Sequence, residues 1–544
     1  MDSHGSTRSL TLADLPHDIL RDILDYFVDD PDYRMGPRFD DLPHYDDDDF
    51  KTLQSLRSVC RSFCNIASPL LIPTLRVRID SKSLNRIGQI AKNPLIVAGV
   101  RTLQVCTAYR PRELAEDARA YRDLQSKVLR SLERACDWHT EFMHEMSEDE
   151  LEGDEGEIVK AMHTYWSMHS SWRAWPESDD GKYTALLSES FDEYRRLQHE
   201  QEQLLTDGSF VATLAAFTSR LPSLRAVSFL DRADVGLDDF SGRDNLTVLA
   251  NDHAKFRQLL VAPHTWAALE ESSTIPDIPT VKLLWQLPIA MHANGIPLPA
   301  IAISRIPILS NFHHLCPSNN DWTALGAACS TLESIYLSSG NHGVLRQEHM
   351  PPESQSHLNN YVSALLSGPH LQTLEVDLYG LQLNTGSNHD DKTPTMLNPL
   401  GAAISSLRAR DLRDIVLGEI AFTQSELEHL FSAVGRKLGS IRFYCVGVTQ
   451  PGTWAHALHI LREKIMASSR ECTAQLSRLC GGEFERFKEG KPRVRADSWG
   501  LSAMSSSSGT CEREKELWEA VERYVRGEGE GNPLVEIEGG RIGC

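Results

Sequence analysis

Histidine and cysteine side chains that could bind a metal come close together in this sequence at two places. His456 and His459 are three residues apart in a segment expected to be helical, so both imidazoles would lie on one helical face. Because no third ligand follows at a suitable spacing, a surface pair is the favoured interpretation. His313 and His314 are followed closely by Cys316 in an apparent loop, and metal binding is disfavoured there as well.

Motifs of known enzyme classes are missing from the sequence. It has no G-x-S-x-G nucleophile elbow, no H-E-x-x-H metalloprotease motif, no Walker pattern and no dinucleotide-binding fingerprint. We therefore assign no catalytic residue, no metal ligand and no cofactor, and we expect that the protein is not itself an enzyme.

The amino-acid composition argues against some classes of binding partner and indicates a cellular compartment. The chain has 544 residues, 41% hydrophobic and 24% charged, which is ordinary for globular proteins. A net charge of −21 argues against a nucleic-acid partner and against an anionic membrane surface, because both need clustered Lys and Arg. The 11 cysteines include no C-x-x-C pair, which is typical of reduced thiols in the cytoplasm or the nucleus. No stretch approaches the roughly 18 apolar residues of a membrane span, so a soluble, non-secreted protein is expected.

Apolar residues near the N-terminus recur at helical spacing. Pro16 suits the first position of a helix, where its missing N–H is not needed. The first apolar stripe consists of Leu15, Ile19, Leu20, Ile23, Leu24 and Phe27, and the second of Leu53, Leu56, Val59, Cys60, Phe63 and Ala67. Short helices of this kind barely bury such faces on each other. Some Leu and Ile should therefore stay exposed unless a partner helix covers them.

The same segment carries a resemblance to a known family. Along the chain come Leu-Pro, a carboxylate with Ile-Leu, a second Ile-Leu, Leu-x-x-Leu-Arg-x-Val-Cys-Arg-x-Phe and Ala-x-Pro-Leu-Leu. This order resembles the F-box, a helical module that docks a variable receptor onto the Skp-type adaptor of a cullin ubiquitin ligase. The resemblance implies an adaptor surface and small core made by Leu15, Pro16, Ile19, Leu20, Ile23, Leu24, Val59, Arg61 and Phe63. One departure is an acidic insert at residues 29–50, where the family usually has a short turn; it is expected to be a solvated loop.

A strand-like template recurs through the rest of the chain. It consists of an apolar residue, two variable ones, an apolar one, a variable one and an apolar one, and most copies follow a helix-like run. The copies after the first strands near Leu75 and Leu103 start at Leu224, Leu298, Leu332, Leu371, Leu412 and Leu438. The intervals are irregular, so the pattern predicts a degenerate leucine-rich-repeat-like α/β solenoid, in which stacking buries each unit's apolar face. The region resembles the divergent repeats of many fungal F-box proteins. A globular three-layer α/β domain is the competing fold.

These patterns divide the chain into expected regions. Residues 1–9 are a disordered tail, 10–73 the F-box, 74–480 the solenoid and 481–544 a linker with an amphipathic helix and a closing LVEIE strand. A helical insertion at 107–209 interrupts the solenoid. Its acidic run Glu145–Glu157 is more simply a charged disordered loop than a recognition feature for a basic partner.

The expected function is that of a binding adaptor. The resemblance implies that the F-box binds a Skp-type adaptor, and through it a cullin scaffold, while the repeats present a target protein for ubiquitin transfer. Variable strand positions would face outward, which makes Tyr336, Glu375, Asp377, Arg442 and Tyr444 candidates for target contact. The alternatives are an F-box scaffold acting outside the ligase, and an enzyme or ligand-binding protein whose site is assembled from distant residues.

Overall fold

The computed structural model describes residues 15–25, 47–144, 155–178, 181–233, 242–270, 277–307, 309–340, 347–349, 352–378, 382–384, 398–449, 451–468, 472–487, 512–529 and 531–538. The fold is mixed α/β, as the alternation of helix-like and strand-like segments predicts. Residues 1–9, most of the acidic insert at 29–50, most of the acidic run from Glu145 and the linker before residue 512 lie outside the described residues.

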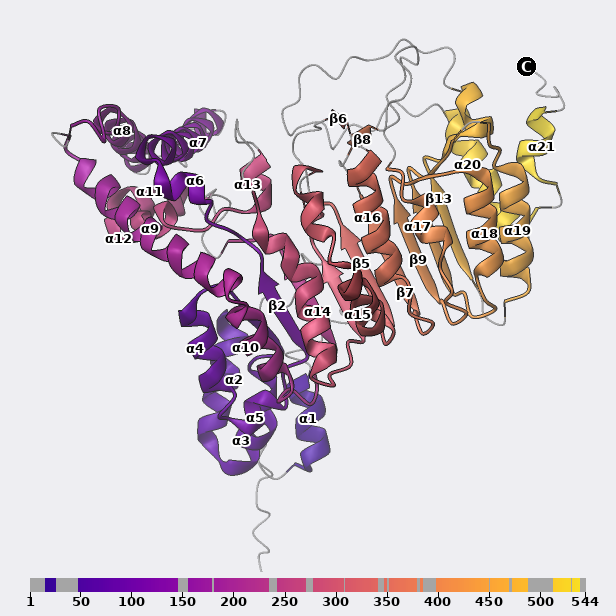
Figure 1. Ribbon diagram of the computed structural model, residues 1–544, viewed down its shortest axis with the longest axis horizontal. Coiled ribbons are helices and arrows are strands. Elements are labelled where there is room, and N and C mark those ends of the chain that lie inside the picture. The colour runs from indigo at the N-terminus through magenta and orange to yellow at the C-terminus, as the bar shows by residue number, and fades with distance from the viewer. Residues whose placement is uncertain are drawn as a thin grey trace, which may run out of the picture.

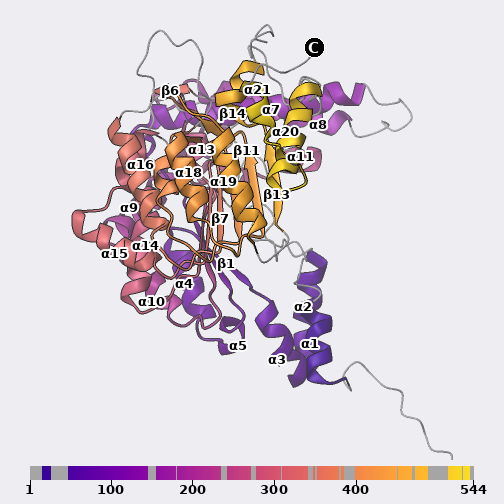
Figure 2. The same cartoon turned by 90° about the vertical axis from the view of Figure 1, so that its right-hand side faces the viewer.

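Three short helices form a separate unit at the N-terminus. They are α1 (His17–Asp25), α2 (Asp47–Val59) and α3 (Arg61–Ala67), the last continued by the 3-10 turn η3 (Ser68–Leu70). The unit has its own small core, formed by Leu20, Leu24, Leu53, Phe63, Ile66, Ala67, Leu70 and Leu71. Figure 2 shows the three helices projecting away from the sheet and the helices that cover it.

A nine-stranded parallel sheet forms the centre of the molecule, and its strands lie side by side in chain order. They are β1 (Thr74–Val77), β2 (Thr102–Cys106), β3 (Ala226–Leu230), β4 (Ala300–Ile303), β5 (Ser334–Ser338), β7 (Thr373–Asp377), β9 (Asp414–Gly418), β11 (Ser440–Tyr444) and β13 (Thr473–Ser477). Every strand predicted from the template is confirmed. The sequence reasoning missed β13, because Glu471 stands where the template has its leading leucine and Ala474 where it has the second apolar residue.

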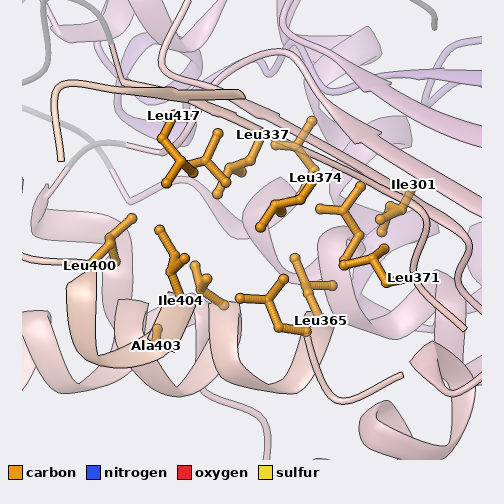
Figure 3. Close-up of a cluster of buried hydrophobic side chains, with 14 of the residues drawn as sticks. Ile301, Leu337, Leu365, Leu371, Leu374, Leu400, Ala403, Ile404 and Leu417 are labelled. Carbon is orange, nitrogen blue, oxygen red and sulfur yellow. The ribbon is translucent and has the colours of Figure 1, made fainter. Parts of the chain in front are cut away.

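One row of helices covers a face of this sheet (Figure 1). Each helix packs against its neighbours in the row. In order they are α4 (Ser81–Ile90), α10 (Ser209–Thr218), α14 (Leu283–Ala293), α15 (Asn319–Cys329), α16 (Pro352–Leu365), α17 (Gly401–Ser405), α18 (Gln424–Ala433) and α19 (Ala455–Met466). The sheet register aligns the apolar template residues, so that Ile335, Leu374 and Ile415 lie side by side toward the helices. Figure 3 shows the strand residues Leu337, Leu374 and Leu417 facing helix residues such as Leu365 and Ile404.

The last three repeats share a second local structure. Immediately after β9, β11 and β13, the residues Glu419, Cys445 and Arg478 take left-handed backbone angles, with φ between 51° and 54°. The chain then turns into a very short strand, and these strands pair in parallel as β10 (Ala421–Phe422), β12 (Gly447–Val448) and β14 (Cys480–Gly481). A further short pair is β6 (Gln347–His349) with β8 (Gln382–Asn384). The same backbone geometry at the same point of three units shows that they are structural repeats.

The helical insertion has a core of its own, drawn from two parts of the chain. Between β2 and β3 it comprises α6 (Arg112–Glu116), α7 (Ala118–His144), α8 (Glu155–Trp172) and α9 (Thr184–Thr206). Two helices between β3 and β4, α11 (Arg243–Asn251) and α12 (His253–Leu260), complete this core with Leu246, Leu249 and Phe256. The expected insertion at 107–209 is therefore only part of this helical unit. Trp172 and Trp175 are buried in it, whereas Trp166 is 62% exposed.

Two helices close the C-terminal end of the sheet. These are α20 (Glu512–Val525), which packs on β13 and α19, and α21 (Pro533–Glu538). The amphipathic helix around Leu517 is confirmed, but the predicted LVEIE strand is wrong because these residues belong to α21. The helix starts at Pro533, a favourable first helical residue, and Leu534 anchors it in the main core. Among the described residues, no helix has the length and apolar character needed to cross a bilayer.

Candidate functional site

Helix α1 presents apolar residues on two faces. Its first turn closes where the Leu20 amide donates to the Pro16 carbonyl oxygen at 3.0 Å. Leu20 and Leu24 are each 2% exposed and belong to the core of the N-terminal unit. Ile19 is 44% exposed and Ile23 is 39% exposed. Because residues four apart on a helix are neighbours, these two isoleucines form one exposed apolar patch, which we name the Ile19/Ile23 patch.

The chain breaks its helical path between α2 and α3. Cys60 has an extended backbone, with φ −160° and ψ 171°, and is the N-cap residue of α3. Val59 and Cys60 are both exposed, Val59 by 63%. The prediction of one continuous apolar stripe that includes Cys60 is therefore wrong here. The break shifts the helical phase, and Phe63 is the next side chain that reaches the core.

The residues expected to form the adaptor surface divide into two groups. Leu20, Leu24 and Phe63 are buried and hold the N-terminal unit together. The remaining side chains are exposed or half-buried, and they are Leu15, Pro16, Ile19, Ile23, Val59 and Arg61. Only this second group is available to a partner without unfolding the unit.

The N-terminal unit is held close to the first strands of the sheet. Within the unit, Arg57 Nε donates to Ser68 Oγ at 2.9 Å, and this hydroxyl donates to the Cys64 carbonyl oxygen at 2.6 Å. Just beyond it, Gly99 comes so near to Pro69 that a Cβ on residue 99 would stand 1.6 Å from the Pro69 carbonyl oxygen. The end of the N-terminal unit therefore packs closely against the segment that leads into β2.

The predicted target-contact residues fall on two neighbouring rows across the sheet face that points away from the helix row. The parallel register places Tyr336, Glu375, Val416 and Arg442 in one row, and Asp377, Gly418 and Tyr444 in the next. We name these two rows the open face. Glu375, Asp377, Arg442 and Tyr444 are half-buried there.

Tyr336 differs from the other candidates because its residue is only 6% exposed. It lies in the middle of the sheet, beside Ala302 on β4 and Glu375 on β7. Burial raises the pKa of the Tyr336 phenol. The expected exposure of Tyr336 is therefore wrong, because alternation along a strand sets the direction of a side chain but not how far its neighbours cover it.

Arg442 and Tyr444 on β11 are the open-face residues best suited to anchor a partner. Arg442 is half-buried, and its Nε makes no hydrogen bond within the described part of the chain, which is uncommon for a buried polar atom. The Tyr444 hydroxyl accepts a hydrogen bond of 2.5 Å from Arg478, whose guanidinium carbon lies 5.2 Å from the ring centre. Arginine and tyrosine, with tryptophan, are enriched among the residues that contribute most to binding at protein interfaces.

The two histidine clusters of the sequence have different surroundings. His459 is bonded through Nδ1 to the Tyr524 hydroxyl at 2.9 Å. His313 and His314 meet Asp277, and the ligand atoms of the three residues lie within 4.8 Å of one another. The His314 Nε2 to Asp277 Oδ1 distance is 2.6 Å, a hydrogen bond. These three groups could hold a metal ion, but sequence reasoning missed Asp277 because it is far from the histidines along the chain.

Comparison with known proteins gives this chain no family. No protein-family model, no curated protein and no solved structure matches it. The chemistry of the Ile19/Ile23 patch and of the open face is therefore the basis for inferring a function.

Proposed function

We propose that this protein is the substrate receptor of a Skp-cullin-F-box ubiquitin ligase. In this proposal the unit α1–α3 is an F-box that binds a Skp-type adaptor, and the sheet region is a degenerate leucine-rich-repeat-like solenoid that binds the target. The observation that carries the proposal is the Ile19/Ile23 patch, on a helix whose other apolar residues already form a core.

Hydrophobic burial supports an apolar partner surface for this patch. Fully burying an Ile side chain contributes about 1.5–3 kcal/mol, so covering the exposed parts of two such residues contributes roughly 2 kcal/mol. Pro16 and Val59, which are exposed as well, extend the apolar area of the unit. A small three-helix module that leaves this much apolar surface uncovered is expected to bind a partner there.

The stacked strands support the solenoid part of the proposal. Nine parallel strands in chain order, three of them followed by the same left-handed turn, form an array in which each unit contacts its neighbours. Such arrays present a long, rigid face for binding. Glu375, Asp377, Arg442 and Tyr444 of the open face are the proposed target contacts.

The proposed mechanism needs no catalytic residue in this chain. Holding a target beside the conjugating enzyme raises the effective concentration of the target lysine, which accelerates transfer without new chemistry. The close contact between Pro69 and Gly99 would limit the movement of the N-terminal unit, and so limit changes in the distance between adaptor and target.

Affinity purification of the full chain tests the adaptor assignment. We expect the Ile19→Asp/Ile23→Asp variant to recover at least tenfold less Skp-type adaptor than the wild type, with an unchanged urea unfolding midpoint because both side chains are exposed. Val248→Asp is the matched control, since Val248 is 42% exposed on α11, and it should keep the adaptor. Equal adaptor recovery by the double variant would show that the Ile19/Ile23 patch is not the binding surface.

The same purification separates a ligase receptor from an F-box scaffold that acts outside the ligase. A receptor should recover the cullin subunit together with the adaptor, and both should be lost from the Ile19→Asp/Ile23→Asp variant. Adaptor without cullin would contradict the ligase role while leaving the F-box assignment intact.

A further inference from the structure

A small cavity lies where the first three strands of the sheet end. Its walls come from residues that follow β1, β2 and β3, including Asp80, Ala108 and Ala233, and from Gln201 on α9. The carboxyl ends of parallel strands are where open α/β sheets commonly bind ligands. The volume that the centre of a water molecule can occupy in this cavity is ≈ 30 Å³. A single water needs about 10–15 Å³ on this measure, so a small tetrahedral ion fits, whereas an aromatic ring does not.

The cavity is strongly basic. Three arginines line it, Arg78, Arg110 and Arg232, against a single carboxylate, Asp80. That carboxylate is already engaged: Oδ1 accepts a hydrogen bond from the Ser83 amide at 2.6 Å, and Oδ2 lies 3.0 Å from Arg78 Nε. The lining therefore carries an excess of positive charge.

Arg110 is the most unusual of these side chains. It is only 8% exposed, and its backbone amide donates to Gln201 Oε1 at 2.9 Å, which holds it against α9. Its Nε donates to the Val261 carbonyl oxygen at 2.9 Å. The two terminal amino groups of Arg110 make no hydrogen bond or ion pair with any residue in the described part of the chain.

Such a group is costly to keep in place without an anion. Burial lowers the pKa of the Arg110 guanidinium, since the charged form loses hydration there. The carboxylates of Asp80 and Glu200 attract this charge, but neither forms an ion pair with Arg110, and each already accepts a hydrogen bond from a backbone amide, that of Ser83 and Ser81 respectively. A buried charge without a partner destabilises a fold, whereas a hydrogen-bonded counter-ion restores the lost interactions.

We infer that this cavity binds a phosphate-class oxyanion, held by Arg110 with Arg78 and Arg232. Guanidinium groups present paired N–H donors that match the spacing of phosphate oxygens, and such charge-assisted bonds are about twice as strong as neutral ones. The bound ion would connect the ends of β1–β3 to the helical insertion through the Arg110–Gln201 contact. The source is either inorganic phosphate or the terminal group of a small phosphate ester.

Thermal unfolding of the full chain, at constant ionic strength, tests this inference. Added inorganic phosphate should raise the melting temperature of the wild type saturably, whereas an equal ionic strength of sodium chloride should not. Glycerol 3-phosphate and glycerol form the second pair of probes. Stabilisation by glycerol 3-phosphate but not by glycerol would identify phosphate esters as ligands. Stabilisation by inorganic phosphate alone would identify the free ion. If neither phosphate probe stabilises the protein beyond chloride, the inference is wrong.

Variants locate the site. Arg110→Met should abolish the phosphate response, and isothermal titration with Arg232→Gln, at an exposed position, should show at least threefold weaker phosphate binding without loss of fold. Arg119→Gln is the control, because Arg119 is an exposed arginine of α7 that pairs with Glu177 at 2.6 Å outside the cavity. The assignment would be overturned if Arg232→Gln kept the phosphate affinity of the wild type and Arg110→Met kept its thermal response to phosphate. Any bound ion would then lie outside this cavity.

Discussion

His264 is a half-buried residue whose imidazole the fold keeps neutral. Its Nε2 makes no hydrogen bond in the described part of the chain, while its backbone pairs with Tyr109. Burial, and then the positive charge of Arg110, lower the pKa of His264 to about 4. The unfolded imidazole has a pKa near 6.5, so between about pH 4 and 6.5 the unfolded state binds the additional proton.

This difference predicts the direction of a pH effect on stability. Because the unfolded state binds more protons in that window, the free energy of unfolding should rise with pH, by at most about 1.4 kcal/mol per pH unit from this residue. Urea unfolding at pH 4.5, 5.5 and 6.5 measures the slope. We expect His264→Phe to reduce it and His163→Gln, at an exposed position of α8, to leave it unchanged. An equal slope in His264→Phe would contradict the assigned cause.

At the residue scale, sequence patterns predict the direction in which a side chain points better than they predict how far its neighbours cover it. Spacing identified the apolar residues of α1, but only packing shows that Leu20 is covered while Ile19 is exposed. For Tyr336, the alternation of side chains along the strand correctly predicted the face of the sheet on which it lies, but its predicted exposure to solvent was wrong. Arg110 and Asp277 were missed because their partners, such as Gln201 and His314, are distant in sequence and no local pattern joins them.

Gly99 is the residue that lets the N-terminal helices approach the sheet. A side chain there would collide with the Pro69 carbonyl, so we expect Gly99→Ala to lower the free energy of unfolding by about 1–3 kcal/mol or more, as other overpacked substitutions do. Gly88→Ala is the control. Gly88 lies in α4 with open space around it, and alanine should stabilise that helix by up to about 1 kcal/mol. Urea unfolding of both variants measures the difference, and equal midpoints would contradict the role given to Gly99.

At the element scale, the strands were predictable because their periodicity repeats. A leading leucine and two alternating apolar residues mark β3, β4, β5, β7, β9 and β11, and the structure places the alternating residues in register toward one layer of helices. The break at Cys60 and the helix α21 were not predictable in the same way. Each depends on a single turn of chain, where apolar spacing is too short to distinguish a helix from a strand.

At the scale of the whole molecule, one continuous core runs from β1 to the C-terminal helices. The shared core follows from repetition, since each unit covers the apolar face of the next. The helical insertion is the part that sequence reasoning placed least completely, because its core joins helices on both sides of β3. The helices between β2 and β3 and those between β3 and β4 form this core together. No regular period in the sequence reveals such an arrangement.

Helix α20 protects the last strand of the sheet. The Leu476 amide of β13 donates to Glu522 Oε1 at 2.6 Å, and Val521 and Val525 are fully buried in the main core. An uncovered edge strand pairs readily with other chains. We therefore expect Val521→Asp/Val525→Asp to lower the free energy of unfolding by at least about 3 kcal/mol, the effect of charges forced into an apolar core, and to cause self-association.

Sedimentation and urea unfolding of the purified chain measure both effects. The matched control is Val535→Asp on α21, because Val535 is 55% exposed and the same substitution there should leave the protein monomeric and stable. The predicted association comes from β13, so its amide hydrogens should exchange faster in the double variant while those of β5, in the middle of the sheet, stay protected. A monomeric double variant with wild-type stability would show that the array does not depend on α20 to close its end.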